Sequence, residues 1–144
     1  MEKSVIFLVE DNKADEELTV RALKKSRIRN EILVARDGQE ALDLLFGPQA
    51  ESVFPPDGVP EMIILDVDLP RVDGLTILKK IREHSKTKMV PVMILTGSKE
   101  DQTRTDSFLN GANCFILKPL DCAHFAEAVE KISSFWLVGD KSPR

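Results

Sequence analysis

Apolar residues gather in five short runs along the chain. The runs cover residues 5–9, 32–35, 62–65, 90–95 and 114–117. Each run has the length of a β-strand and shows no alternation of apolar and polar positions, which is typical of strands buried on both faces. The pattern therefore predicts five buried strands.

The segments between these runs carry apolar residues at helical spacing. Leu75, Leu78 and Ile81 follow this spacing, and Phe125 and Val129 continue it near the C-terminus. Strands and helices therefore alternate five times along the chain. This order predicts a doubly wound α/β domain, in which a parallel sheet with right-handed crossovers is covered by helices on both faces.

Polar residues stand where the predicted helices begin. Asn12, Asp37, Ser98 and Asp121 can each cap a helix N-terminus, and Asp37 with Glu40 has the form of a capping box. The capping residues and the apolar periodicity thus predict the same helix starts.

One segment, from Gly47 to Pro60, is rich in glycine and proline and too irregular to predict a helix or a strand. A surface insertion of this length costs little loop entropy. We therefore interpret it as a tolerated excursion, with contact to a partner as the alternative.

The composition fits a soluble globular protein. The 144 residues suit one domain with its own core, and 42% of them are hydrophobic and 31% charged. The formal net charge of -4 argues against binding to nucleic acid, which requires clustered lysine and arginine. We expect no nucleic-acid partner.

The first apolar run is too short for the core of a signal peptide or for a membrane helix. Cys114 and Cys122 form no CxxC pair and lie near no histidine at zinc-ligand spacing. We therefore expect a cytoplasmic protein without a membrane segment.

Polar side chains follow four of the five predicted strands. Glu10 and Asp11 follow the first, Asp66 the third, Thr96 the fourth and Lys118 the fifth. In open parallel sheets, ligands bind at the carboxyl ends of the strands. Taken singly, each residue is better explained as a helix cap, a turn former or an exposed lysine, but their shared placement predicts a site.

Three carboxylates at one edge of a sheet repel one another unless a cation compensates their charge. Mg²⁺ suits the group Glu10, Asp11 and Asp66, because it takes oxygen ligands and keeps waters that phosphate oxygens can replace. A carboxylate such as Asp66 can then attack a phosphoryl group. Lys118 supplies positive charge to that group, and Thr96 supplies a hydroxyl.

Four motifs in this order resemble the receiver domains of two-component response regulators. They are Leu-Val-Glu-Asp-Asn, Ile-Leu-Asp-Val-Asp-Leu-Pro, Leu-Thr-Gly-Ser and Leu-Lys-Pro. The resemblance spans about residues 3–136. It implies a single receiver domain over residues 1–144, with a short C-terminal tail and a flavodoxin-like sheet in the strand order 2-1-3-4-5.

The resemblance also implies a role for each acidic residue. Glu10 and Asp11 match the metal-binding pair, with Asp11 as a direct ligand and Glu10 acting through water. Asp66 matches the phosphoacceptor. Asp68 matches the position whose backbone carbonyl binds the metal, while its side chain can influence how fast the phosphoryl group hydrolyses.

The remaining motif residues match the switch of that family. Thr96 matches the switch hydroxyl and Lys118 the lysine that contacts the phosphoryl group. Phe115 stands at the position of an aromatic switch residue, although it can equally be a core residue. The bond between Lys118 and Pro119 matches one that is usually cis in the family.

The glutamate at position 10, the long segment from Gly47 and the Phe-Trp-Leu ending resemble the small response regulators paired with bacterial and cyanobacterial phytochromes. This implies a stand-alone regulator that takes its phosphoryl group from a sensor histidine kinase, with a phytochrome as the candidate. Its output would pass to a partner or a dimer through the surface of helix 4, strand 5 and helix 5. Phe135, Trp136 and Leu137 lie at the edge of that surface, where packing onto the domain is the competing interpretation.

Two other functions remain open from the sequence. A phosphatase of the haloacid dehalogenase type would use Asp66 and Asp68 as nucleophile and general acid, but Pro70 and the upstream acidic pair depart from that pattern. A receiver-like scaffold would lack a ligand, the lysine or the acceptor, and none is missing here. The favoured function is not that of an enzyme on other substrates, because a receiver catalyses only its own phosphorylation and dephosphorylation.

Overall fold

The computed structural model describes residues 5–25, 30–55, 57–69, 72–97, 101–118 and 122–136. Its strands are β1 (Val5–Val9), β2 (Glu31–Ala35), β3 (Met62–Asp66), β4 (Val92–Thr96) and β5 (Cys114–Leu117). Its helices are α1 (Lys13–Lys25), α2 (Gly38–Phe46), α3 (Ala50–Val53), α4 (Gly74–Glu83), α5 (Asp101–Leu109) and α6 (Cys122–Trp136).

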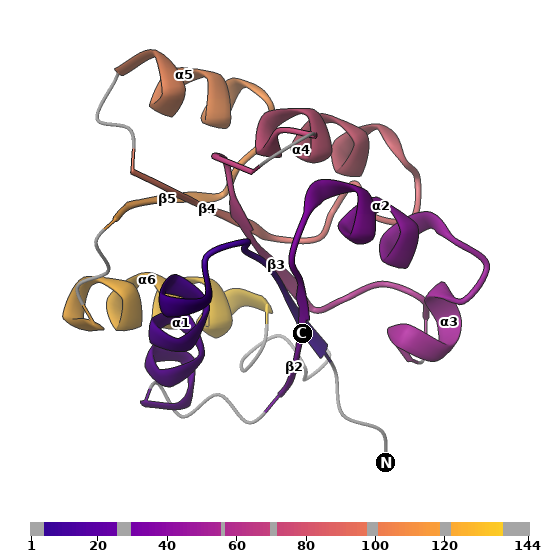
Figure 1. The fold of residues 1–144 in the computed structure, drawn as a ribbon, viewed down its shortest axis with the longest axis horizontal. Coiled ribbons are helices and arrows are strands. Elements are labelled where there is room, and N and C mark those ends of the chain that lie inside the picture. Colours follow the sequence, from indigo (N-terminus) through magenta and orange to yellow (C-terminus); the bar gives the residue numbers. More distant parts are fainter. Residues whose placement is uncertain are drawn as a thin grey trace.

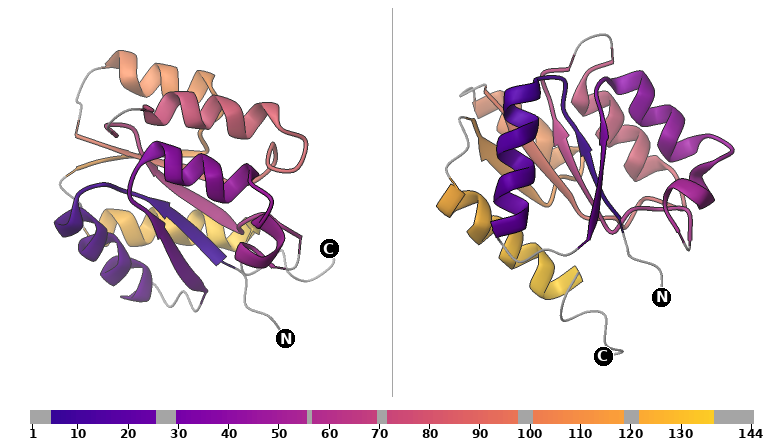
Figure 2. Two further views of the ribbon diagram at one scale, coloured as in Figure 1. Left: turned by 45° about the vertical axis from the view of Figure 1, so that its right-hand side comes forward. Right: turned by 60° about the horizontal axis from the view of Figure 1, so that its bottom comes forward.

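The five strands form one parallel sheet in the order β2-β1-β3-β4-β5. Helices α1 and α6 cover one face of the sheet, and α2, α4 and α5 cover the other (Figures 1 and 2). The predicted doubly wound fold and its strand order are therefore confirmed.

The core lies in two layers, because successive side chains of a strand point to opposite faces of the sheet. On β1, Phe7 packs into the layer under α2 and α4, whereas Ile6 and Leu8 pack into the layer under α1 and α6. Phe125 and Val129 of α6 are fully buried in the second layer, as their spacing predicts. The three central strands β1, β3 and β4 thus bury both of their faces. The edge strands β2 and β5 are only partly buried, so the prediction of five fully buried strands is wrong at the two edges of the sheet, where a strand has a neighbour on one side only.

The predicted and observed strands differ most at β4. The apolar run predicts a start at Val90, but the strand begins at Val92. Val90 belongs to a turn in which its N–H donates to the carbonyl of Thr87 at 3.0 Å, and Pro91 has no N–H to donate to a ladder. Val90 is buried although it precedes the strand, so the apolar run is longer than β4.

Two of the four predicted helix caps are observed. Asp37 accepts from the N–H of Glu40 at 2.8 Å, and Asn12 accepts from the N–H of Asp15 at 2.9 Å. The reciprocal bond of the capping box is shifted by one residue, because Glu40 accepts from the N–H of Arg36 at 2.8 Å. The other two predicted caps, Ser98 and Asp121, lie outside the described residues.

The segment from Gly47 to Pro60 is more ordered than predicted. The sequence predicts no helix or strand in this segment, but the structure contains the short helix α3 there, so that prediction is wrong. Phe54, which ends α3, is fully buried and packs edge-on against Phe7 with ring centroids 5.1 Å apart. One buried aromatic therefore anchors the segment to the core.

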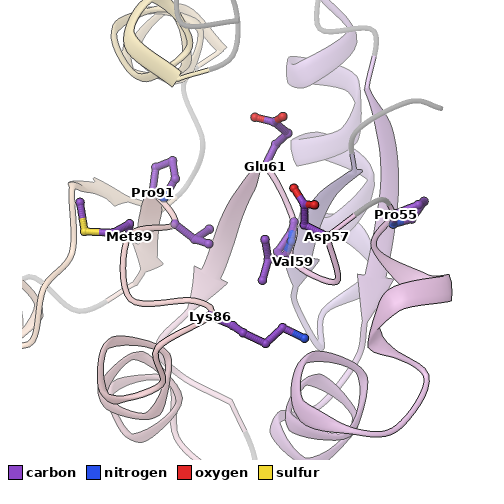
Figure 3. A pocket seen from close by; sticks show the side chains of 9 residues that line it. Pro55, Asp57, Val59, Glu61, Lys86, Met89 and Pro91 are labelled. Carbon is purple, nitrogen blue, oxygen red and sulfur yellow. The ribbon is translucent and has the colours of Figure 1, made fainter. Parts of the chain in front are cut away.

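Beyond this anchor, the segment forms one wall of a pocket of about 260 Å³ (Figure 3). Asp57, Glu61 and Lys86 line it together with Met89 and Pro91. Glu61 precedes β3 and Pro91 precedes β4, so the pocket lies at the amino edge of the sheet.

Among the helices of the described residues, none is long and apolar enough to span a membrane.

Arg82 of α4 ties three segments together at that edge. Its guanidinium donates to the carbonyls of Val90 at 2.7 Å and Gly111 at 2.9 Å, and to the side-chain oxygen of Asn113 at 2.9 Å. The same oxygen of Asn113 accepts from the N–H of Val92, the first residue of β4, at 2.8 Å. Partial burial lowers the pKa of Arg82, because removing the guanidinium from water disfavours its charged form.

We predict that Arg82→Ala lowers the free energy of unfolding by about 2 to 3 kcal/mol, because it removes several hydrogen bonds made by a charged donor. Arg82→Lys should recover only part of the loss, since an ammonium cannot form the planar fork. Urea denaturation measures both. Lys79→Ala on the exposed side of α4 is the control, and an Arg82→Ala protein as stable as that control would contradict the prediction.

Candidate functional site

Four of the residues that the sequence predicts to be functional lie at the carboxyl edge of the sheet. Glu10 directly follows β1, Asp66 ends β3, Thr96 ends β4 and Lys118 directly follows β5. The N–H of Lys118 donates to the carbonyl of Thr96 at 2.8 Å, which continues the pairing of β5 with β4 past the last strand residue. The register between β4 and β5 thus fixes the backbone position from which the Lys118 side chain extends toward Asp66.

The start of α4 lies close against the end of β3 and helps to hold that end in place. The N–H of Gly74 donates to the carbonyl of Val67 at 3.1 Å. A Cβ atom at Gly74 would lie only 2.5 Å from the carbonyl oxygen of Asp66. Any larger residue at position 74 would therefore displace the end of β3 that carries Asp66.

The ammonium of Lys118 lies among three carboxylates. Its Nζ is 2.9 Å from Asp66 Oδ2, 2.9 Å from Asp15 Oδ2 and 3.0 Å from Glu10 Oε1. Burial alone would lower the pKa of Lys118, but its hydrogen bonds to Asp15, Asp66 and Glu10 outweigh burial and raise that pKa. Lys118 therefore stays charged.

Glu10 is fully buried beside a second buried carboxylate, Asp66. Its burial, followed by the closeness of Asp66, raises the pKa of Glu10 to about 8, and Lys118 opposes this shift without cancelling it. Glu10 Oε2 accepts from the N–H of Asn12 at 3.2 Å. Glu10 Oε1 faces Lys118 at 3.0 Å but makes no well-aligned hydrogen bond within the described part of the chain.

Glu10, Asp11 and Asp66 each offer an oxygen within 4.8 Å of the others. This all-oxygen group, with a buried and incompletely bonded Glu10 oxygen, fits a hard divalent cation such as Mg²⁺. Asp11 is exposed, whereas Glu10 and Asp66 are buried, so the group is open to solvent on one side. The metal contact predicted for the backbone carbonyl of Asp68 stays a prediction.

The side chain of Asp68 contacts the predicted switch residue. Asp68 Oδ2 accepts from the hydroxyl of Thr96 at 3.1 Å and from the N–H of Gly97 at 3.2 Å. Its own N–H donates to Asp66 Oδ1 at 2.9 Å. Thr96 is thus brought to the site, but its hydroxyl donates to Asp68.

Phe115 lies on β5, partly buried against the core layer that includes α4. Its ring centroid is 6.3 Å from that of Phe108 on α5, with the planes inclined by 38°. This position is compatible with both interpretations of Phe115. Pro119, with the predicted cis bond, and Leu137 lie outside the described residues, as do the side chains of Phe135 and Trp136.

The sequence reasoning missed Asp15. This residue lies in the first turn of α1 and brings a third carboxylate to Lys118. The available signal was an aspartate in the first turn of the helix that directly follows Glu10 and Asp11, close enough along the chain to lie at the same edge of the sheet. Acidic residues in a first turn are common for electrostatic reasons alone, which hid this signal.

The chain matches a known family over most of its length. The model of the response regulator receiver domain matches residues 6–130. The response regulator Rcp1 of Synechocystis sp. is 35% identical over 133 residues, which cover 92% of this chain and 88% of Rcp1.

Solved structures agree with this match. The Mn²⁺-bound form of Rcp1 has a TM-score of 0.77 at 34% identity, covering 98% of this chain and 99% of that one. The phosphorylated cyanobacterial phytochrome response regulator RcpA has a TM-score of 0.76 at 34% identity, covering 96% of both chains. The bacteriophytochrome response regulator AtBRR has a TM-score of 0.76 at 39% identity, covering 96% of this chain and 98% of that one.

The raised pKa of Glu10 makes the effect of Mg²⁺ depend on pH. The pKa is about 8 in the folded protein and 4.5 for an ordinary glutamate, so the metal-free folded state gains stability from this group at low pH and loses it as pH rises toward 8. A bound cation favours the ionised form. We predict that millimolar Mg²⁺ raises the melting temperature by a few degrees at pH 8 and by less at pH 6.

Differential scanning calorimetry with and without Mg²⁺ tests this prediction. In Glu10→Gln the difference between the two pH values should shrink, because the titrating group is gone. A native protein whose response to Mg²⁺ is the same at both pH values would contradict the assignment of the titration to Glu10.

Proposed function

The chain belongs to the response regulator receiver family, and we propose that it accepts a phosphoryl group on Asp66 from a sensor histidine kinase. One observation carries this proposal: the buried carboxylate of Asp66 lies 2.9 Å from the Lys118 ammonium and next to the acidic pair Glu10 and Asp11. A carboxylate nucleophile, a cation for the phosphoryl oxygens and a candidate metal group therefore lie together.

The transfer follows from this arrangement. A carboxylate oxygen of Asp66 forms a bond to phosphorus, and the bond from phosphorus to the histidine nitrogen of the kinase breaks. That nitrogen keeps the electron pair of the broken bond. Glu10, Asp11 and Asp66 would hold Mg²⁺, which supplies positive charge opposite the phosphoryl oxygens.

Lys118 and Thr96 then stabilise the product. The ammonium that now pairs with Asp66 Oδ2 is close enough to pair with an oxygen of the phosphoryl group on that carboxylate. For the Thr96 hydroxyl to donate there as well, its bond to Asp68 has to break. Asp68 thereby sets how readily Thr96 changes partner.

The two alternatives from the sequence are less well supported. The match to the receiver family over residues 6–130 does not favour a haloacid dehalogenase-type phosphatase. A scaffold without phosphorylation has no need to gather Glu10, Asp66 and Lys118 at one buried point. Accordingly, we propose a signalling protein that catalyses only its own phosphorylation and dephosphorylation.

The relatives suggest the source of the phosphoryl group. RcpA and AtBRR are phytochrome and bacteriophytochrome response regulators, which supports a phytochrome-type sensor kinase as the partner of this chain. The metal of Rcp1 in its solved form is Mn²⁺, which supports Mg²⁺ or Mn²⁺ here. We further propose that residues 1–144 act as one receiver domain in the cytoplasm.

The output surface is proposed to lie on α5, β5 and α6, which correspond to helix 4, strand 5 and helix 5 of the family. Apolar side chains are exposed on it: Leu109 is 79% exposed, Phe108 43% and Leu117 42%. β5 is also an edge strand of the sheet. These features support contact with a protein partner or a second copy.

We predict that incubation with a small phosphodonor and Mg²⁺ adds one phosphoryl group to the protein, detected by intact mass. Asp66→Asn should show no addition, because the nucleophile is removed. Asp57→Asn, which changes an exposed aspartate at the opposite edge of the sheet, is the control and should react as the native protein does. Unaltered labelling of Asp66→Asn would refute the acceptor, and turnover of phosphate esters would favour the phosphatase.

We predict that phosphorylation promotes dimerisation through the α5 and β5 surface. Leu109→Glu should weaken the phosphorylated dimer at least about tenfold, because it places a charge in an apolar contact. Light scattering over a concentration series, with and without phosphodonor, measures this effect. Gln39→Glu on α2 adds the same charge on another side, and a native protein that stays monomeric in both states rules out the dimer.

A further inference from the structure

Lys118 has three carboxylate partners, and they differ in one respect. Glu10 and Asp66 belong to the candidate metal group, whereas Asp15 does not. Among the described residues, Asp15 is thus the carboxylate partner of Lys118 that lies outside that group. Its distance to Nζ, 2.9 Å, equals that of Asp66.

This difference matters when a divalent cation binds. The cation would bind the same carboxylate oxygens of Glu10 and Asp66 that now contact Lys118, and it would repel the ammonium over a few ångströms. The Lys118 side chain is 14% exposed and flexible, so it can turn toward solvent if its partners are withdrawn. A receiver, however, needs this lysine in place when the phosphoryl group arrives.

Asp15 is well placed to keep it there. Its N–H donates to Asn12 Oδ1 at 2.9 Å, and its carbonyl accepts from the hydroxyl of Thr19, a fully buried residue, at 2.8 Å. The backbone of Asp15 is therefore held on both sides. Its side chain is 27% exposed, compared with 2% for that of Asp66 and 0% for that of Glu10.

We propose that Asp15 is a positioning residue that anchors Lys118 when the metal group is loaded, so that the ammonium stays within reach of the phosphoryl oxygens on Asp66. Asp15 touches no reacting atom and acts through Lys118. This inference rests on the proposed function for its catalytic consequence, but the anchoring itself does not require phosphorylation.

The first test measures the phosphorylation rate against Mg²⁺ concentration. Asp15→Asn keeps the shape of the side chain and removes its charge, and it should slow phosphorylation at saturating Mg²⁺ about tenfold, as expected for the loss of one charge-assisted hydrogen bond. Asp15→Glu restores the charge and should recover most of the rate. Glu17→Gln removes one charge from an exposed position on the same helix and should stay within about twofold of the native rate.

The second test observes Lys118 without any phosphodonor. The side-chain ammonium is followed by nitrogen-15 NMR, and Lys118→Arg identifies its signal. In the native protein and in Glu17→Gln the ordered signal should persist when Mg²⁺ is added. In Asp15→Asn it should persist without Mg²⁺ and move to the position of a solvated lysine when Mg²⁺ is added.

The two measurements separate the possible failures. A Lys118 signal that is unaffected by Mg²⁺ in Asp15→Asn overturns the anchoring role, even if phosphorylation is slower. An unchanged phosphorylation rate in Asp15→Asn overturns its catalytic consequence. A native protein that is not phosphorylated refutes the proposed function, while the NMR comparison still decides whether Asp15 anchors Lys118.

Discussion

The pairing of one ammonium with several carboxylates at the carboxyl edge of the sheet is the interaction on which the site depends. Glu10 and Asp66 are almost completely buried side by side, an arrangement that like charges oppose. Lys118 makes it tolerable, and it can do so because the order β1-β3-β4-β5 places its strand two positions from Asp66. A long flexible side chain spans that distance, and a shorter one would leave the carboxylates uncompensated.

The same pairing explains how the site can respond to a phosphoryl group. In the present arrangement Lys118 is divided among carboxylates, and Thr96 donates to Asp68. On the proposed function, both groups change partner when negative charge appears on Asp66, so two local contacts have two alternative arrangements. Thr96 ends β4, which pairs with β5, and Phe115 of β5 packs near Phe108 of α5. A population shift at the site can therefore reach the exposed apolar residues of α5 without a new fold.

How much of this was predictable depends on whether the signal is local. Each buried strand is a run of neighbouring apolar residues, and a polar residue stands at its end. Asp66, Thr96 and Lys118 could therefore be placed at one edge of the sheet from the sequence. Phe54 could not, because one aromatic in a segment rich in glycine and proline gives no periodic signal, and its partner Phe7 is distant along the chain. Asp15 was missed because its meaning comes from Lys118, more than one hundred residues away.

The two edges of the sheet differ in what they do for the protein. At the amino edge, Arg82 satisfies carbonyls from two connections with a single charge and ties α4 to the start of β4. At the carboxyl edge, the neighbouring buried carboxyl groups of Glu10 and Asp66 reduce stability when both are ionised, and their oxygens belong to a group that fits a cation. Functional sites commonly carry such local costs, which the rest of the structure has to offset. Hydrogen bonds that hold the starts of the strands at the amino edge also help to place the side chains at the carboxyl edge, because each strand joins the two edges.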